Sequence, residues 1–247
     1  MERVGKLSLS SEPQIVIDGQ FHILFDPELC ESPSADLFNV ERLKGQGVIG
    51  ATTGGRGASC IIRFPDRTWV LRHYRRGGLV SKVLNDQYFG LNREKCRSWS
   101  EWQLLHQLFR EGFPVPRPVA ASYWPGCGYY RAALITEYLP ETRTLAETLS
   151  QGPLPDAVWA EIGRCVARFH QRGVYHADLN AHNIMLDRQQ DIYILDFDKG
   201  EIRAPGRWQD TNLKRLLRSL NKLADENPKL NIRPNDWDAL LTGYENG

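Results

Sequence analysis

The sequence predicts an α+β protein whose N-terminal part is rich in β-strands and whose shorter C-terminal part is mainly helical. Short apolar runs bounded by turn residues predict strands. These runs lie at residues 15–17, 21–25, 60–64, 68–74, 119–123 and 129–136. Apolar residues at a spacing of three and four predict helices, which lie at residues 92–110, 156–172, 213–223 and 235–244. We therefore expect two lobes, residues 1–136 and residues 137–247.

The composition is that of a soluble globular protein. With 247 residues, 41% hydrophobic and 25% charged, the chain can form one bilobal domain or two small ones. A formal net charge of +1 gives no general electrostatic argument for a nucleic-acid partner, and we expect none. The five cysteines are widely spaced without a C-x-x-C pair, which favours reduced thiols in a cytosolic compartment. No signal peptide or bilayer-spanning apolar run is recognised, so we expect the chain inside the cell, in solution or on a membrane surface.

The first strands lead to a glycine-rich segment at residues 52–59. Asp18-Gly19 predicts a tight hairpin turn before it, and a short helix is expected near residues 35–43. Gly55 and Gly57 would let backbone N–H groups approach phosphate oxygens without a Cβ in the way. Glycine clusters are usually plain turns, but the strand pair that follows this one favours nucleotide binding.

The second strand of that pair carries Arg72, which can contact phosphates through its planar guanidinium. Its expected partner is Glu101 in the helix predicted at 92–110, because Glu101 shares a helical face with three leucines three, four and seven positions later. A carboxylate on such a face needs a cation. Glu94 is the weaker alternative, and a Glu101 that extends into solvent is the third reading.

Two other segments have open interpretations. Residues 72–82 are basic and contain two glycines, which suits an anionic acceptor, an anionic lipid surface or an ordinary solvated loop equally well. Glu137 begins the stretch to Pro140 that we expect to connect the lobes. Backbone groups there would meet the edge of an adenine ring.

The stretch from His176 to Asn183, followed by Asp196-Phe197-Asp198, is the strongest functional signal. Apolar runs at 184–186 and 192–195 around a polar turn predict a β-hairpin. A four-residue turn at 188–191 would place Asn183 directly opposite Asp196, close enough to share one cation.

These residue types suit phosphoryl transfer. Mg²⁺ is typically held by one or two carboxylates and the phosphates themselves, which fits Asp196 with Asn183 as metal ligands. A separate carboxylate is needed to orient the attacking hydroxyl and accept its proton, which fits Asp178. Isolated Asp and Asn residues more often cap turns. The full pattern H-x-D-x-x-x-x-N, hairpin and D-F-D instead matches a kinase catalytic loop with its metal-binding motif.

Helices are expected on both sides of this stretch. Asp156 is the predicted cap of the helix at 156–172, whose apolar stripe ends before Gly173. Its stripe consists of Val158, Ile162, Cys165, Val166 and Phe169. His170 in the same helix is expected to be structural. The helix at 213–223 has a leucine face and basic residues within 214–222, which fits either an anionic membrane or acidic partner, or a core-packed helix with solvated charges.

Four motifs resemble the 3-deoxy-D-manno-octulosonic acid (Kdo) kinase family. They are R-H-Y-x-R-G-G-L (72–79), F-P-V-P (113–116), H-x-D-L-N-A-H-N-I (176–184) and L-D-F-D-K (195–199). The resemblance implies a small protein-kinase-like bilobal fold that uses ATP and Mg²⁺ to phosphorylate the 4-hydroxyl of Kdo on a lipid A precursor. It also implies a peripheral location at the cytoplasmic face of the bacterial inner membrane. Asp178 corresponds to the family's catalytic residue, with Asn183 and Asp196 as the expected metal ligands.

The chain departs from ordinary protein kinases at Ala177, where those have a loop arginine, and at Asp198, where D-F-G has its glycine. The A-P-E motif is absent from the sequence, and the tail is short, so a small sugar on a lipid fits better than a peptide. Two alternatives stay open. One is a kinase-fold phosphotransferase for a core heptose, an aminoglycoside-like molecule or a protein; the other is a pseudokinase scaffold, favoured by Arg72 in place of lysine.

Overall fold

The computed structural model describes residues 12–53, 59–74, 88–89, 96–125, 129–227 and 230–247. The chain divides into two compact units: Met1–Gly112 with Pro116–Tyr138, and Phe113–Val115 with Leu139–Gly247. The last change of unit follows Tyr138, within the stretch expected to connect the lobes. The strands and helices below confirm the predicted α+β class.

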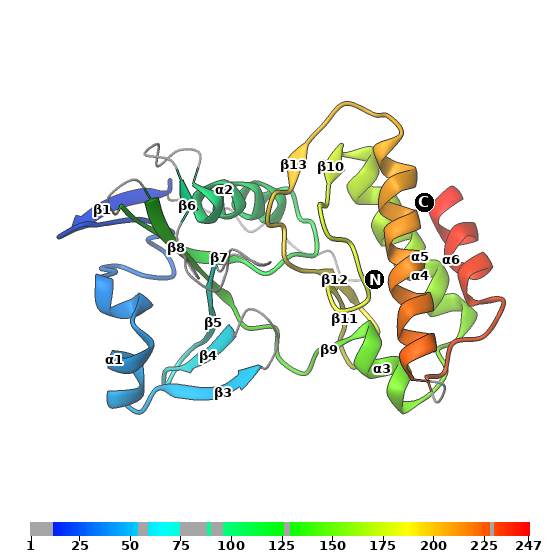
Figure 1. Ribbon diagram of the computed structural model, residues 1–247, viewed down its shortest axis with the longest axis horizontal. Coiled ribbons are helices and arrows are strands. Elements are labelled where there is room, and N and C mark those ends of the chain that lie inside the picture. The colour runs from blue at the N-terminus through cyan, green and yellow to red at the C-terminus, as the bar shows by residue number, and fades with distance from the viewer. Residues whose placement is uncertain (1–11, 54–58, 75–87, 90–95, 126–128, 228–229) are drawn as a thin grey trace. The chain divides into compact units, whose positions relative to one another are not determined.

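The first unit is built on an antiparallel sheet in the order β1-β2-β7-β8-β5-β4-β3, with β6 paired to β8 (Figure 1). Its strands are β1 (Gln14–Asp18), β2 (Phe21–Phe25), β3 (Ile49–Thr53), β4 (Ser59–Arg63), β5 (Thr68–His73), β6 (Tyr88–Phe89), β7 (Pro118–Pro125) and β8 (Tyr129–Glu137). The six strands predicted for this part are therefore confirmed. The β7–β8 hairpin lies at the centre of the sheet and joins the N-terminal hairpin to the β3–β5 set.

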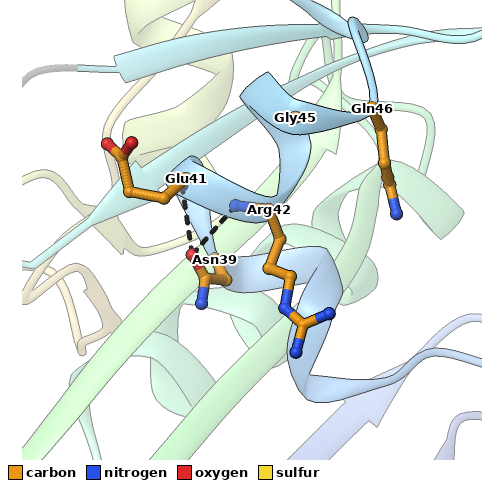
Figure 2. Close-up of a pocket in the computed structure, with 5 residues that line it drawn as sticks. All are labelled: Asn39, Glu41, Arg42, Gly45 and Gln46. Atoms are coloured by element: carbon orange, nitrogen blue, oxygen red, sulfur yellow. Dashed lines mark hydrogen bonds between the residues drawn. The ribbon is translucent and has the colours of Figure 1, made fainter.

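Turn residues set the local geometry as expected. Gly19 has φ +60° in the β1–β2 turn, which suits a residue without Cβ. A 3₁₀ turn, η1 (Ala35–Phe38), and helix α1 (Val40–Gly45) account for the predicted short helix. Figure 2 shows the cap of α1: the Asn39 side chain accepts hydrogen bonds from the backbone N–H groups of Glu41 (3.1 Å) and Arg42 (3.2 Å). The open pocket drawn there is lined by these cap and helix residues and by none of the predicted site residues.

The core of the first unit is formed by buried residues of the sheet, mostly at alternate positions along each strand. Phe38 from η1 and Leu43 from α1 pack against these sheet residues. The buried sheet residues are Ile23, Phe25, Cys60, Ile62, Trp69, Leu71, Val119, Ala120, Ala133 and Ile135. Helix α2 (Arg97–Arg110) packs against β7 and β8. It begins at Arg97 rather than near residue 92, because the backbone of Cys96 is extended (φ −71°, ψ 139°); residues 92–95 lie outside the described part.

The second unit is mainly helical. It contains α3 (Leu145–Gln151), α4 (Asp156–Gln171), α5 (Trp208–Glu226) and α6 (Asp236–Glu245), with short strands before α3 and between α4 and α5 (Figure 1). The strands are β9 (Arg143–Thr144), β11 (Ile184–Leu186) and β12 (Ile192–Ile194) in one sheet and β10 (Val174–Tyr175) with β13 (Glu201–Ile202) in another. No helix in the described ranges is long and apolar enough to cross a membrane.

Helix α4 confirms the predicted stripe, all five residues of which are buried. Its cap differs from the prediction: Pro155 holds the cap position, and Asp156 is the first helical residue, with its carboxylate bound by Arg233 at 2.7 Å. Gly173 follows with φ +82°, the left-handed geometry with which helices commonly end.

Helices α4 and α6 approach closely through two glycines, since a Cβ added to Gly163 or Gly243 would lie 2.0 Å from a carbonyl oxygen of the other helix.

Candidate active site

The loop from His176 to Asn183 lies between β10 and β11, and His176 anchors it. His176 is 4% exposed. Its Nε2–H donates to the carbonyl of Leu195 (2.8 Å), and its Nδ1 accepts from the N–H of Asp178 (3.1 Å). One nitrogen must donate and the other accept, so the ring is neutral with its proton on Nε2. Burial lowers the pKa of His176 in agreement with this state. His176 therefore ties Asp178 to the residue that precedes Asp196.

The loop's amide side chains fix the turn that carries Asp178. Asn180 donates to the Asp178 carbonyl (2.8 Å) and accepts from the N–H of His182 (2.8 Å). Asn183 also donates to the Asp178 carbonyl, through Nδ2 at 2.9 Å. Because a carbonyl can only accept, this bond sets the orientation of the Asn183 amide and directs its Oδ1 elsewhere. The Asp178 side chain is 56% exposed and accessible to a substrate.

The β11–β12 register differs from the prediction by one residue. Ile184 pairs with Ile194 and Leu186 with Ile192, so Asn183 lies opposite Leu195, whose N–H donates to the Asn183 carbonyl at 2.8 Å. The predicted pairing of Asn183 with Asp196 is wrong. Asp187 belongs to the turn rather than to the strand, because its carboxylate accepts from the N–H groups of Gln189 and Asp191, both at 2.9 Å. All four isoleucine and leucine side chains thereby share one buried face.

Asp196 follows the β11–β12 hairpin and has a left-handed backbone conformation (φ +63°). Asp is enriched in this conformation among non-glycine residues. The next residue, Phe197, is 1% exposed and contacts the rings of His176 (centroids 4.8 Å apart) and Phe169 (5.7 Å). The backbone bonds of Leu195 to His176 and Asn183 thus bring the predicted base and both predicted metal ligands into one loop cluster. Among the described residues no group of three or more His, Cys, Asp or Glu side chains forms a metal site.

In the first unit, Arg72 on β5 pairs with Glu101 on α2, as predicted. One Arg72 nitrogen donates to both Glu101 carboxylate oxygens at 2.5 Å. Glu101 is 2% exposed, so the solvent-facing alternative is wrong; Glu94 lies outside the described residues. Tyr74 is an additional partner that sequence reasoning missed. Its hydroxyl is hydrogen-bonded to Glu101 and its ring lies 4.9 Å from the Arg72 guanidinium. Tyr74 directly follows β5, and the strand period of two, continued by one residue, places it on the same face as Arg72 and could have indicated the contact.

The remaining predicted nucleotide-binding residues have varied outcomes. Gly55 and Gly57 lie outside the described residues, as do residues 75–82 of the basic segment. Glu137 ends β8, where its N–H donates to the Arg117 carbonyl (2.9 Å), and the N–H of Tyr138 donates to the Thr68 carbonyl (3.0 Å). Burial raises the pKa of the Glu137 carboxyl. The backbone N–H groups of Glu137 and Tyr138 are both hydrogen-bonded within the first unit. An adenine ring would therefore have to contact other backbone groups of this stretch.

Helix α5 contacts the loop through residues that sequence reasoning did not assign. Asn212, Arg215 and Ser219 hydrogen-bond His176, Asp178 and Ala181 respectively. Their spacing of three and seven places them on one helical face beside Leu213, Leu216 and Leu220, which are buried. The core-packed reading of the leucine face is therefore confirmed. Arg215 on α5 binds the Asp178 side chain and is therefore not part of a free basic surface.

His170 on α4 is structural, as expected, and gives the fold a pH dependence. It is 4% exposed, its Nδ1 lies 2.8 Å from the Tyr244 hydroxyl, and burial lowers its pKa from 6.5 to about 4. Between these values the unfolded chain binds a proton that the folded chain does not. The free energy of unfolding should therefore fall as pH decreases from 6.5 towards 4, by up to about 1.4 kcal/mol per pH unit.

Urea melts of the wild type and His170→Gln between pH 8 and pH 4 measure this slope, which should be shallower in the variant. His182→Gln, which removes an exposed histidine, is the matched control and should follow the wild type. Equal slopes for all three proteins would contradict the assignment.

Comparison with known proteins identifies the family. The model of the lipopolysaccharide kinase (Kdo/WaaP) family matches residues 40–244. A 3-deoxy-D-manno-octulosonic acid kinase of Vibrio vulnificus is 40% identical over 92% of this chain and 96% of its own length. Those of Stenotrophomonas maltophilia and Xanthomonas campestris are 42% and 41% identical, each over 90% of this chain and 89% of their own. The resemblance based on the four sequence motifs is confirmed, and the chain belongs to the lipopolysaccharide kinase (Kdo/WaaP) family.

Proposed function

We propose that this chain is a 3-deoxy-D-manno-octulosonic acid kinase that transfers the γ-phosphoryl group of ATP to the 4-hydroxyl of Kdo on a lipid A precursor. The observation that carries the proposal is its similarity, over about nine-tenths of both chains, to proteins named for that activity. A kinase family implies ATP as the phosphoryl donor. The precursor as acceptor and the 4-hydroxyl rest on the family resemblance.

The loop cluster supplies groups for this reaction. The acceptor oxygen forms a bond to the γ-phosphorus, the bond from that phosphorus to the β,γ-bridging oxygen breaks, and ADP leaves. The hydroxyl proton passes to the carboxylate of Asp178, which orients the hydroxyl before transfer. The exposure of that carboxylate, on a turn fixed by His176 and Asn183, supports the assignment.

Asn183 and Asp196 would hold Mg²⁺. Both provide oxygen ligands of the kind this ion prefers, and the bond from Asn183 Nδ2 to the Asp178 carbonyl leaves the amide oxygen to face a ligand. When bound, the ion neutralises charge on the phosphate oxygens. In the first unit, Arg72 would contact the nucleotide phosphates while Glu101 fixes its position. We assign Gly55, Gly57 and the Glu137 stretch to the nucleotide as well, and retain the lobe boundaries 1–136 and 137–247.

A lipid-linked acceptor requires access to a membrane surface. We propose peripheral binding at the cytoplasmic face of the inner membrane, aided by the exposed residues Lys214, Arg218 and Lys222 on α5 and by the basic segment at 72–82. Each such residue near an anionic surface contributes about 1 kcal/mol to binding.

The test is transfer of labelled γ-phosphate from Mg²⁺-ATP to a Kdo–lipid A precursor. Phosphate recovered on Kdo, dependent on Mg²⁺, is the expected result. A heptose-containing core, an aminoglycoside and a generic peptide are the parallel acceptors. Labelling of one of these in place of Kdo would overturn the proposed acceptor, and failure to bind ATP would overturn the proposed reaction.

A further inference from the structure

Helix α5 presents three polar residues to the loop that carries Asp178. We call Asn212, Arg215 and Ser219 the α5 stripe; they follow one another at intervals of three and four and therefore share one face of the helix. Each contacts a different residue of the loop, in the same order along the chain as the stripe itself.

The two outer members of the stripe hold the loop's main chain. Asn212 is 2% exposed; its Oδ1 accepts from the N–H of His176 (3.2 Å) and its Nδ2 donates to the His176 carbonyl (3.0 Å). Ser219 Oγ accepts from the N–H of Ala181 (3.2 Å). The loop is thus attached to α5 on both sides of Asp178, which fixes the distance between the helix and the Asp178 backbone.

The middle member, Arg215, reaches the Asp178 side chain. Its Nη1 donates to Oδ1 of Asp178 at 2.5 Å, and the two side chains are 44% and 56% exposed. A pair this exposed contributes little to stability. Its geometry instead suits orientation of the carboxylate, because the loop main chain on both sides of Asp178 is hydrogen-bonded to the helix that carries Arg215. Position 177, next to Asp178, is alanine, and the cation that the described residues place at the carboxylate is Arg215 of α5.

We propose that Arg215 is a positioning residue for Asp178, holding Oδ1 so that Oδ2 is presented to the acceptor hydroxyl. The inference rests on the proposed role of Asp178 as the base. Correct orientation of a reacting group greatly increases the reaction rate, and a displacement of about 1 Å can lower that rate about a hundredfold. Arg215 therefore acts on turnover through Asp178 and has no direct part in nucleotide binding.

The test begins with Arg215→Ala, measured with the purified full-length chain on Mg²⁺-ATP and the Kdo–lipid A precursor. We expect kcat to fall by roughly 10- to 100-fold, with the KM for ATP within about twofold of wild type and a nearly unchanged melting temperature. Arg215→Lys should retain intermediate activity, and added guanidinium chloride should restore part of the activity of Arg215→Ala. Arg164→Ala, which removes an equally exposed arginine paired with Glu161 on α4, is the matched control and should behave as wild type.

A double-mutant cycle separates positioning from a structural role. In an Asp178→Asn background the further change Arg215→Ala should have little effect, since its target carboxylate is gone. An equal loss in both backgrounds would overturn the proposal, as would unchanged kcat in Arg215→Ala. A raised acceptor KM with unchanged kcat would instead assign Arg215 to acceptor binding. If the wild type itself transfers no phosphate to this acceptor, the proposed function fails and not the role of Arg215.

Discussion

Replacing Asp178 by alanine is expected to abolish phosphoryl transfer while ATP binding stays close to wild type. The carboxylate acts on the acceptor hydroxyl, and loss of a positioned general base typically costs a factor of about 10² to 10⁴ in rate. The Asp178 backbone contacts that hold the loop, from its N–H to His176 and from Asn183 to its carbonyl, do not require the side chain. Single-turnover transfer and calorimetric ATP titration of the same preparation measure the two effects separately.

Asp196→Ala provides the contrast, because a metal ligand acts on the nucleotide as well. We expect it to weaken Mg²⁺-dependent ATP binding in addition to slowing transfer. Asp225→Ala removes an exposed aspartate from α5 and serves as the control for loss of one negative charge. An equal loss of ATP affinity in Asp178→Ala and Asp196→Ala would contradict this division of roles.

The second large effect is expected for Arg72→Ala, which leaves the buried Glu101 carboxylate without its arginine. Removing one partner of a buried ion pair typically destabilises a protein by about 3–5 kcal/mol. The hydrogen bond from Tyr74 remains and keeps the loss towards the lower end. If Arg72 also contacts the phosphates, the KM for ATP should rise roughly tenfold or more, as for other hydrogen bonds to charged groups. Urea unfolding and steady-state kinetics measure the two quantities.

A paired substitution distinguishes stability from nucleotide contact. Arg72→Met combined with Glu101→Leu removes both charges, and should recover much of the stability because no buried charge remains unpaired. The KM for ATP should stay high in this double variant. Arg63→Ala, which removes an exposed arginine from the neighbouring strand β4, is the matched control. Arg72→Ala with a wild-type KM would exclude Arg72 from the nucleotide site.

Local patterns in the sequence predicted most helices and strands. They also predicted an ion pair in which one residue's own chemistry requires a particular partner. The stripe of α4 and the strands of the first unit follow from apolar periodicity. The Arg72–Glu101 pair was predictable because a carboxylate on an apolar helical face requires a cation. The β11–β12 register was not, since it depended on whether Asp187 would extend the strand or close the turn with its own carboxylate. Buried side-chain alternation would have favoured the observed register.

The α5 stripe could not be predicted from local patterns. Its four hydrogen bonds to the loop join residues more than thirty positions apart along the chain. Periodicity correctly indicated the leucine face of α5, but the polar residues beside it look like any solvated helical surface. Only the tertiary fold shows that Arg215 contacts Asp178. One of the basic residues that the sequence assigned to a charged surface therefore contacts the loop cluster instead.

The central place of the β7–β8 hairpin bears on how the chain folds as it leaves the ribosome. Strands β1–β2 and β3–β5 are synthesised first, yet β2 and β5 pair with β7 and β8 and not with each other. Until β7 has emerged β2 has an unpaired edge, and until β8 has emerged β5 has one, each of the kind that recruits other chains. Closure must then bring together strands far apart in sequence, which is slow. Translation that stalls before β8 should therefore produce aggregated nascent chains, even where the finished protein is stable.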